Sequence, residues 1–390
     1  MSFPISFSDR LNSLPPYLFA ELDAAKRKAK AEGKDIIDLG VGDPDLPTPR
    51  PVILALAEAA KDPKNHRYAL DQGLSELRYA IQKWYHDRFE VSLDPQTEIL
   101  PLLGSKEGIA HLPLGLINPG DAVLVPDPCY PPYRSGTLFA GGEVVSLPLL
   151  EKNGFRPDFS SVKESLLKKA KLLFLNYPNN PTGSIVEGGF FDDAIDFCRR
   201  HRIMMCHDAA YTEIAFEGFR PSSFLERPGA GEVGIEFHSL SKTFNMTGWR
   251  IGFACGRREI LASLSKVKAN IDSGIFQAIQ IAGIAALRLP KRDLTARNKI
   301  YEERRDLLVD GLNELGWKVG KPRASFYVWA KVPVRKSSSD FSKLALEKAG
   351  IVITPGVGFG PAGEGYVRMA LTISKERIGE ACERFRKLLG

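Results

Sequence analysis

The segment from Ser239 to Arg250, Ser-Leu-Ser-Lys-Thr-Phe-Asn-Met-Thr-Gly-Trp-Arg, combines residue types that suit a phosphate-bearing aldehyde. The amine of Lys242 could form an imine with such a compound. The hydroxyls of Ser239 and Ser241 and the forked guanidinium of Arg250 could hold a phosphate dianion. Taken alone, the segment could also be a Ser/Thr-rich loop that carries a surface lysine.

Three further polar residues follow apolar runs earlier in the chain. Asp208 closes one run, in His-Asp-Ala-Ala-Tyr, and its carboxylate could pair with the protonated pyridine nitrogen of pyridoxal 5'-phosphate (PLP), which keeps the ring an electron sink. Tyr211 is three residues away, within reach of the same ligand. Asn180, in the turn-rich Asn-Asn-Pro-Thr-Gly, could face the phenolic oxygen of the cofactor. A helix N-cap for Asp208, a half-buried ring for Tyr211 and a bare turn around Asn180 are the alternatives.

Two glycine-containing segments invite a nucleotide interpretation that their spacing does not support. Gly104-Ser-Lys-Glu-Gly108 places Ser105 at a predicted helix start, where free N–H groups and the helix dipole favour a phosphate. It lacks the spacing of a nucleotide P-loop, and a plain serine N-cap is its alternative. Gly356-Val-Gly-Phe-Gly360 fits the dinucleotide motif poorly and predicts a mobile loop.

The elements that position these residues alternate between helix and short apolar strand from about residue 50 to residue 283. Such a pattern predicts a mostly parallel sheet that is buried on both faces, with ligands bound beyond the carboxyl ends of its strands. Each motif above lies at such an end. The predicted strands cover residues 100–103, 122–125, 171–176, 203–206 and 234–238, and a helix covers residues 190–201.

The C-terminal part has a different pattern. Apolar and polar residues alternate at 325–330 and 365–371, which predicts strands covered on one face, with helices at 341–349 and 375–389. We therefore expect an N-terminal arm and part of a small domain at residues 1–48, a large domain at 49–283 and a smaller α+β domain at 284–390. A chain of 390 residues is also longer than one hydrophobic core usually spans.

Composition excludes several classes of protein. The formal net charge of +6 is spread along the chain without a basic block, so nucleic-acid binding is not expected. Five scattered cysteines without a C-x-x-C pair argue against a disulfide framework or a zinc site and for a reducing compartment. No signal peptide and no membrane-spanning apolar run is visible, so we expect a cytoplasmic protein.

The order of the motifs resembles the class I/II aminotransferases of PLP fold type I, from Leu39-Gly-Val-Gly42 to the last helix. The resemblance implies an α/β fold, with a large domain on a mostly parallel seven-stranded sheet and a smaller α+β domain. In chain order the motifs are Gly104-Ser-Lys, Asp-Pro-Cys-Tyr130, Asn180-Pro-Thr-Gly, Asp208-Ala-Ala-Tyr211, Ser-Leu-Ser-Lys242, Arg250 and Arg368.

The resemblance also implies roles around the cofactor ring. Lys242 would form the Schiff base and later move a proton between the substrate Cα and cofactor C4'. Asp208 would pair with the pyridine nitrogen, and Tyr130 would stack on the ring. Tyr211 and Asn180 would bond the phenolic oxygen and so lower the pKa of the imine.

Other residues would hold the phosphate and the substrate. The implied phosphate ligands of the same chain are Ser105, Lys106, Ser239, Ser241 and Arg250. Tyr68 matches a tyrosine that reaches the phosphate across a dimer interface, which implies a homodimer. Arg368 would fork the substrate α-carboxylate, with a backbone contact from Gly42. The remaining substrate-side candidates are Tyr17, Lys106, Tyr130 and Asn180.

Several longer segments of the chain resemble the bacterial LL-diaminopimelate aminotransferases, which would use glutamate to aminate tetrahydrodipicolinate on the route to lysine. An aminotransferase for alanine, aspartate or aromatic amino acids, a C–S lyase and a non-catalytic regulator are the alternatives. Where some members carry an Asn-Gly-Ala-type loop, this chain reads Asp272-Ser-Gly-Ile, which leaves the distal-carboxylate contact open. The matching segments are Leu14-Pro-Pro-Tyr-Leu-Phe19, Gly104-Ser-Lys-Glu-Gly-Ile-Ala110, Asn176-Tyr-Pro-Asn-Asn-Pro-Thr-Gly183, Cys206-His-Asp-Ala-Ala-Tyr211 and Asn270-Ile-Asp-Ser-Gly-Ile-Phe276.

Overall fold

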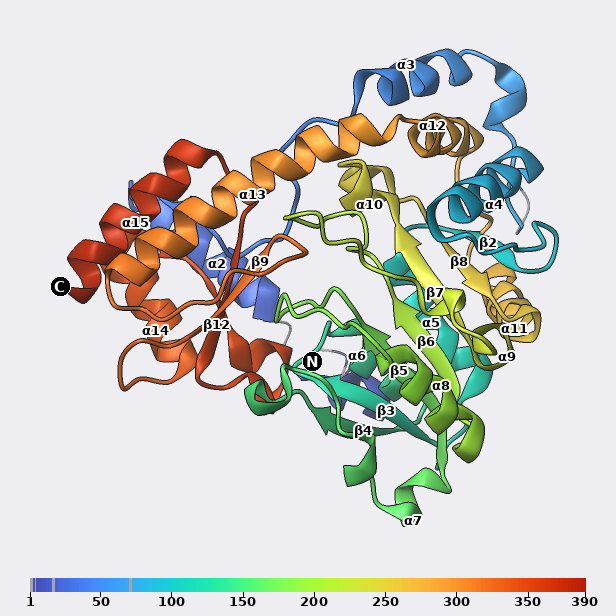
Figure 1. The fold of residues 1–390 in the computed structure, drawn as a ribbon, viewed down its shortest axis with the longest axis horizontal. Coiled ribbons are helices and arrows are strands. Elements are labelled where there is room, and N and C mark those ends of the chain that lie inside the picture. Colours follow the sequence, from blue (N-terminus) through green and yellow to red (C-terminus); the bar gives the residue numbers. More distant parts are fainter. Residues whose placement is uncertain (1–2, 4, 16–17, 70–71) are drawn as a thin grey trace.

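The computed structural model describes residues 3, 5–15, 18–69 and 72–390, with the backbone alone for residues 18–22. Figure 1 shows a larger region built on one sheet and a smaller region that carries the C-terminus. Helix α13 (Lys291–Glu314) runs between the two regions. Among the described residues, no helix is both long and apolar enough to cross a membrane.

The larger region contains a seven-stranded sheet of order β2-β8-β7-β6-β5-β3-β4. β8 runs antiparallel to both of its neighbours, and the other pairs are parallel, which confirms the predicted α/β class with a mostly parallel sheet. The strands are β2 (Ile99–Leu102), β3 (Ala122–Asp127), β4 (Glu143–Pro148), β5 (Ala170–Asn176), β6 (Met204–Asp208), β7 (Gly234–Ser239) and β8 (Gly252–Gly256).

Helices cover both faces of this sheet, which is why most of its strands are apolar throughout. One face packs against α5 (Ser105–Leu116), α6 (Pro132–Phe139) and α11 (Arg258–Ala269). The other packs against α4 (Ser75–Phe89), α12 (Gln277–Leu287) and α8 (Phe190–His201). Helix α3 (Arg50–Ala59) lies on α12 (Figure 1). The short helices of this region are α7 (Glu164–Leu167), α9 (Ala230–Val233) and α10 (Leu240–Thr243).

The smaller region combines two small sheets with the last helices. β9 (Tyr327–Lys331) and β11 (Thr354–Pro355) flank β12 (Tyr366–Ala370) in an antiparallel sheet. β1 (Ile37–Asp38) pairs with β10 (Ile351–Val352) in parallel, so the chain before the larger region contributes to the smaller one. The helices are α1 (Asp9–Asn12), which contacts α6 of the larger region, and α2 (Leu18–Ala31), α14 (Ser338–Leu344) and α15 (Lys375–Leu389) of the smaller region.

The core of the smaller region includes a cluster of aromatic rings. The Trp317 ring lies 5.5 Å from the Phe341 ring and 5.4 Å from the Phe385 ring, both edge-on. The helices predicted at residues 190–201 and 375–389 have the predicted bounds. The domain boundaries at 48/49 and 283/284 remain predictions.

Candidate active site

The turn between β2 and α5 brings Gly104, Ser105 and Arg250 together. Gly104 has φ +78° and ψ 153°, a backbone conformation that only glycine adopts readily, and a side chain there would collide with the Arg250 guanidinium. Ser105 is the first residue of α5, so its N–H belongs to the positive end of that helix. A Cβ at Gly252 would lie 2.8 Å from this nitrogen. The helix end and the guanidinium form a cradle that suits a phosphate.

The predicted serines lie beside this cradle. Ser239 is the last residue of β7, is buried, and pairs with Gly252 in the ladder to β8. Ser241 is buried in α10, and its hydroxyl donates to the Met246 carbonyl over 3.5 Å. Lys106, the second residue of α5, is exposed. Its place at the helix start agrees with a role through its backbone amide rather than its ammonium.

Lys242 lies on α10, directly after β7, and its ammonium points to the loop that follows β1. Its Nζ donates to the Gly42 carbonyl over 2.8 Å. Burial lowers the pKa of Lys242 to about 8, with a further lowering by the charge of Arg368, while the charge of Asp43 opposes the shift. The neutral amine needed to attack an aldehyde is therefore available at a lower pH than for an exposed lysine.

Asp208 ends β6 as a buried carboxylate. Tyr133 donates its hydroxyl to Asp208 Oδ2 over 2.7 Å, and the Ala210 N–H lies 3.3 Å from Oδ1. Burial raises the pKa of Asp208, and the Tyr133 hydrogen bond and the charge of His207 offset part of that rise. Tyr133 was not among the site residues predicted from the sequence. Its only signal is its position in the first turn of α6, three residues after Tyr130.

Tyr327 is a second residue that the sequence analysis missed. Its hydroxyl lies 3.1 Å from that of Tyr211, and a side chain at Gly42 would collide with the same hydroxyl. Tyr327 comes from β9, more than a hundred residues after Tyr211 in the chain. The alternation of apolar residues predicted the strand, but not which of its residues would face Tyr211.

Arg368 joins the two regions of the molecule. It lies on β12 and is 2% exposed. Its Nη1 donates to Asn180 Oδ1 over 2.8 Å, and its Nη2 donates to the Gly40 carbonyl over 2.7 Å. The guanidinium carbon lies 4.2 Å from the Tyr327 ring centroid and 4.7 Å from that of Phe359. Two hydrogen bonds and two rings therefore fix the direction of the fork.

Phe359 belongs to the segment predicted as a mobile loop, and that prediction is wrong. Residues Gly356–Phe359 form a 3-10 helix, η7, and Phe359 is buried. Its carbonyl accepts from the N–H of Cys129, immediately before Tyr130. Phe359 is buried and its carbonyl ties this segment to the larger region, which the glycine spacing alone could not indicate.

For Tyr130, predicted to stack on the cofactor ring, and Tyr68, predicted to contact the phosphate, the structure gives less direct evidence. The Tyr130 ring lies 5.9 Å from the ring of Tyr133, edge-on, and Tyr133 is the residue that donates to Asp208. The Tyr68 side chain is 79% exposed. Tyr17 lies outside the residues that the structure describes.

Asp272, in the loop for which the contact to the distal carboxylate of the substrate was left open, already has hydrogen-bond partners within the protein. Asp272 Oδ1 accepts from the Lys268 ammonium over 2.6 Å and from the Gly274 N–H over 2.7 Å. Lys268 is almost fully buried, and Glu107 of α5 is 3.9 Å away on its other side. Asp272 therefore stabilises its own loop by an internal ion pair.

The loop after β1 is also tied to α13, which no sequence pattern indicated. Arg304 donates Nη1 and Nη2 to the two carboxylate oxygens of Asp45 over 2.7 and 2.8 Å. Thr48 donates its hydroxyl to the Asn245 carbonyl over 2.6 Å. The segment that carries Gly42 is thus held from both regions.

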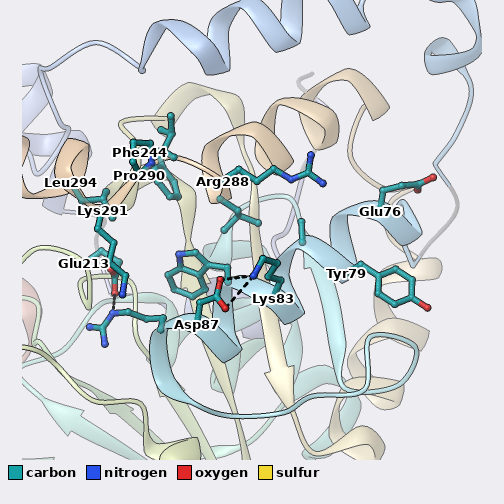
Figure 2. Close-up of a pocket in the computed structure, with 15 residues that line it drawn as sticks. Glu76, Tyr79, Lys83, Asp87, Glu213, Phe244, Arg288, Pro290, Lys291 and Leu294 are labelled. Atoms are coloured by element: carbon teal, nitrogen blue, oxygen red, sulfur yellow. Dashed lines mark hydrogen bonds and ion pairs between the residues drawn. The ribbon is translucent and has the colours of Figure 1, made fainter.

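Figure 2 shows a cavity of about 640 Å³ that includes none of the predicted site residues. It lies between α4, the end of α12 and the start of α13, with the Lys83–Asp87 and Arg88–Glu213 ion pairs in its wall. The predicted chemistry is gathered instead at the carboxyl ends of β5, β6 and β7 and at the edge of the smaller region.

Comparisons with known proteins agree with this arrangement. A family model described as aminotransferase class I and II matches residues 34–385. A protein named LL-diaminopimelate aminotransferase from Syntrophobacter fumaroxidans is 56% identical, over 98% of both chains. A protein of the same name from Moorella thermoacetica is 53% identical, also over 98% of both chains.

Solved structures show the same fold over nearly the whole length. Apo-BacF from Bacillus subtilis superposes with a TM-score of 0.95 at 40% identity, and the match covers 100% of both chains. A mutant aspartate aminotransferase from Thermus thermophilus superposes with a TM-score of 0.91 at 30% identity, and the match covers 99% of this chain and 100% of that one. Family and fold both belong to PLP-dependent enzymes. With the family match spanning both regions of the molecule, the chain belongs to the class I and II aminotransferases.

Proposed function

We propose that this aminotransferase binds PLP at Lys242 and interconverts LL-2,6-diaminopimelate and 2-oxoglutarate with tetrahydrodipicolinate, L-glutamate and water. The observation that supports the transamination is that Lys242 and Arg368 donate to the carbonyls of Gly42 and Gly40, two residues apart in a single loop. The substrate is supported by relatives named LL-diaminopimelate aminotransferase, at 48–56% identity over at least 96% of this chain.

The residues present fit the cofactor. The cradle of Ser105 and Arg250 leaves no room for a side chain at Gly104, as expected where backbone approaches a phosphate. Asp208 is buried, with a hydroxyl donor on one oxygen, and can pair with a protonated pyridine nitrogen. PLP supplies an electron sink for the charge that develops when the substrate Cα loses its proton.

The side chains of the protein handle the proton and the orientation of the substrate. Lys242, with its lowered pKa, can remove a proton from the substrate Cα as a neutral amine and would deliver it to C4' of the bound cofactor. Arg368 forks the α-carboxylate, and Asn180 keeps the guanidinium in its plane. Tyr211 and Asn180 would donate to the phenolic oxygen of the bound cofactor.

We also propose a cytoplasmic homodimer. All five cysteines are free and buried, as expected of a protein in a reducing compartment. Tyr68 is too exposed to serve the site of its own chain and is available to a partner's site. A symmetric dimer, the commonest assembly, would cover it.

The test is a half-reaction with purified PLP-loaded protein. LL-diaminopimelate should convert the Schiff-base absorbance to that of the pyridoxamine form far more efficiently than alanine or aspartate does, and 2-oxoglutarate should restore it. Higher kcat/KM for aspartate would favour the activity named for the Thermus thermophilus structure and refute the substrate proposal. Borohydride reduction followed by peptide mapping should label Lys242, and an adduct on any other lysine would refute its assignment.

A further inference from the structure

We propose that Asn176, His207 and Glu236 form a buried clamp that aligns the carboxyl ends of β5, β6 and β7, and that they are positioning residues for transamination. This strand-end clamp touches neither substrate nor cofactor. It acts through Asn180 and Asp208, whose roles rest on the proposed function.

Glu236 is the centre of the clamp. Its side chain is fully buried in β7, yet both carboxylate oxygens are satisfied. Oε2 lies 2.8 Å from His207 Nδ1, and Oε1 lies 2.8 Å from His238 Nε2. Tyr85 donates its hydroxyl to Oε1 over 2.6 Å, and the Phe224 N–H donates to Oε2 over 3.1 Å. Four donors around one buried acid indicate an anion held in a single orientation.

The protonation of Glu236 follows from these neighbours. Burial alone would raise its pKa, but the hydrogen bonds and charges of His207 and His238 lower it well below the ordinary value. The carboxylate is therefore the acceptor, and His207 Nδ1 is the donor. The imidazole is left with Nε2 directed away from Glu236.

His207 transmits this orientation from β7 across β6 to β5. Its Nε2 lies 3.2 Å from the backbone nitrogen of Tyr177 and 3.1 Å from the Tyr177 carbonyl. Tyr177 directly follows β5 and starts the turn that leads to Asn180. One imidazole thus spans three neighbouring strands at the edge where the chemistry is gathered.

Asn176 makes the second crossing between the same strand ends. Its Nδ2 donates to the Asp208 carbonyl over 2.6 Å, and its Oδ1 accepts from the Asn180 N–H over 2.7 Å. The side-chain amide of Asn176 therefore holds the backbones of both Asp208, which would face the pyridine nitrogen, and Asn180, which would face the phenolic oxygen. The cradle at Ser105 and Arg250 has no part in the clamp. This separation predicts that the clamp affects alignment of the ring more than affinity for the cofactor.

The experiment compares His207→Asn with Tyr85→Phe in the PLP-loaded protein. An asparagine amide can occupy the place of Nδ1 and keep the bond to Glu236, but it cannot reach Tyr177. We expect kcat to fall roughly 10- to 100-fold, as for a small misplacement of reacting groups, with the PLP dissociation constant changed less than about threefold. The absorbance maximum of the bound cofactor should also shift, because its ring contacts move.

Tyr85→Phe is the matched control. It removes a donor from the same carboxylate on the α4 side, where no predicted site residue lies. It should lower the melting temperature but leave kcat and the absorbance maximum as in the wild type. A purely structural network would instead make both variants lose activity in proportion to stability, and that result would overturn the proposal.

Asn176→Ala gives a second arm that does not depend on the charged network. It should reproduce the loss of kcat with retained PLP affinity, and unchanged kcat in this variant would also refute the clamp. Failure of the wild-type protein to form a Schiff base at Lys242 would refute the proposed function rather than the clamp. Normal turnover in the wild type and in both His207→Asn and Asn176→Ala would refute the clamp and leave the proposed function intact.

Discussion

Burial sets the proton affinity of the residues on which the chemistry depends. It lowers the pKa values of Lys242 and Arg368 and raises that of Asp208. For Lys242 the shift is useful, because it frees the amine. For Asp208 the shift is adverse, since the carboxylate must stay ionised to pair with a pyridinium. The Tyr133 hydroxyl supports the ionised form, which gives this residue a function despite its lack of a motif.

The lowered pKa of Lys242 predicts how PLP loading depends on pH. Only the neutral amine attacks an aldehyde, so the rate of Schiff-base formation by apo-protein should rise about tenfold per pH unit below the pKa. It should level off above about 8, rather than near the ordinary 10.5. Stopped-flow absorbance against pH measures this. A rate that still climbs steeply beyond pH 10 would show that Lys242 is not desolvated.

Replacement of Arg368, even by lysine, should lower kcat/KM. Arg368→Ala should raise the barrier in kcat/KM by about 2–5 kcal/mol, as when one partner of a desolvated charge pair is removed. Arg368→Lys should recover only part of this, because an ammonium cannot bond Asn180, Gly40 and a carboxylate in one plane. Steady-state kinetics with LL-diaminopimelate measures both. Full rescue by lysine would contradict a forked contact.

At the level of elements, the site is a set of strand ends and the turns that leave them. Asn180 follows β5, Asp208 ends β6 and Lys242 follows β7, so adjacent strands deliver adjacent functional groups. The turn from β2 to α5 adds the phosphate cradle from the far side of β8. Positive backbone angles at Gly104 and Gly183 let these turns approach their neighbours closely.

The turn at Gly104 carries a prediction. Gly104→Ala places a side chain against the Arg250 guanidinium in a backbone region that only glycine favours, which should cost about 1–3 kcal/mol of unfolding free energy. We expect the PLP dissociation constant to rise as well. Gly120→Ala is the control, because Gly120 also has a positive φ but nothing within 4 Å of its Cβ. Equal effects on PLP affinity in both variants would refute the cradle.

The sequence could predict these elements because buried strands and strand-end motifs are local patterns. Five strands of the sheet were predicted to within a few residues, and α8 and α15 to the residue. β4 was not predicted because it lies at an edge and is largely exposed, and β8 because the glycines at both of its ends are typical of loops. Partners such as Tyr133, Tyr327 and Glu236 could not be predicted, since contact across strands or regions leaves no trace in local spacing.

At the scale of the whole molecule, the loop after β1 connects the two regions. Arg304 of α13 holds Asp45, while Lys242 holds Gly42 and Arg368 holds Gly40. A shift of the smaller region would therefore change the contact of Arg368 with this loop, because Lys242 of the larger region also holds the loop. The proposed substrate contact of Arg368 therefore depends on how the two regions are placed, whereas the proposed phosphate cradle belongs to the larger region alone.

Tyr68 shares an exposed face of the molecule with the loop before α12. Gln277 donates its amide to the carbonyls of Arg67 and Tyr68 over 3.0 and 3.3 Å, and the Phe276 ring lies 6.1 Å from the His66 ring. Tyr68 and Phe276 are 79% and 41% exposed. Exposed aromatic side chains such as Tyr68 and Phe276 are enriched on surfaces that meet another protein chain.

The shared site of a homodimer can be tested by complementation. Lys242→Ala removes the amine of one site, and Tyr68→Ala removes the group offered to the neighbour's site, so each variant alone should be inactive or nearly so at limiting PLP. In a hybrid dimer the subunit that keeps Lys242 receives Tyr68 from the Lys242→Ala subunit, which restores one complete site. Mixing the two variants under conditions that exchange subunits should therefore recover about a quarter of the wild-type activity, as expected for random pairing in a symmetric dimer. A mixture of two separate Lys242→Ala preparations is the control and should stay inactive. Tyr68 acting within its own chain, or a protein active as a strict monomer in light scattering, would give no recovery, because neither subunit could then supply what the other lacks.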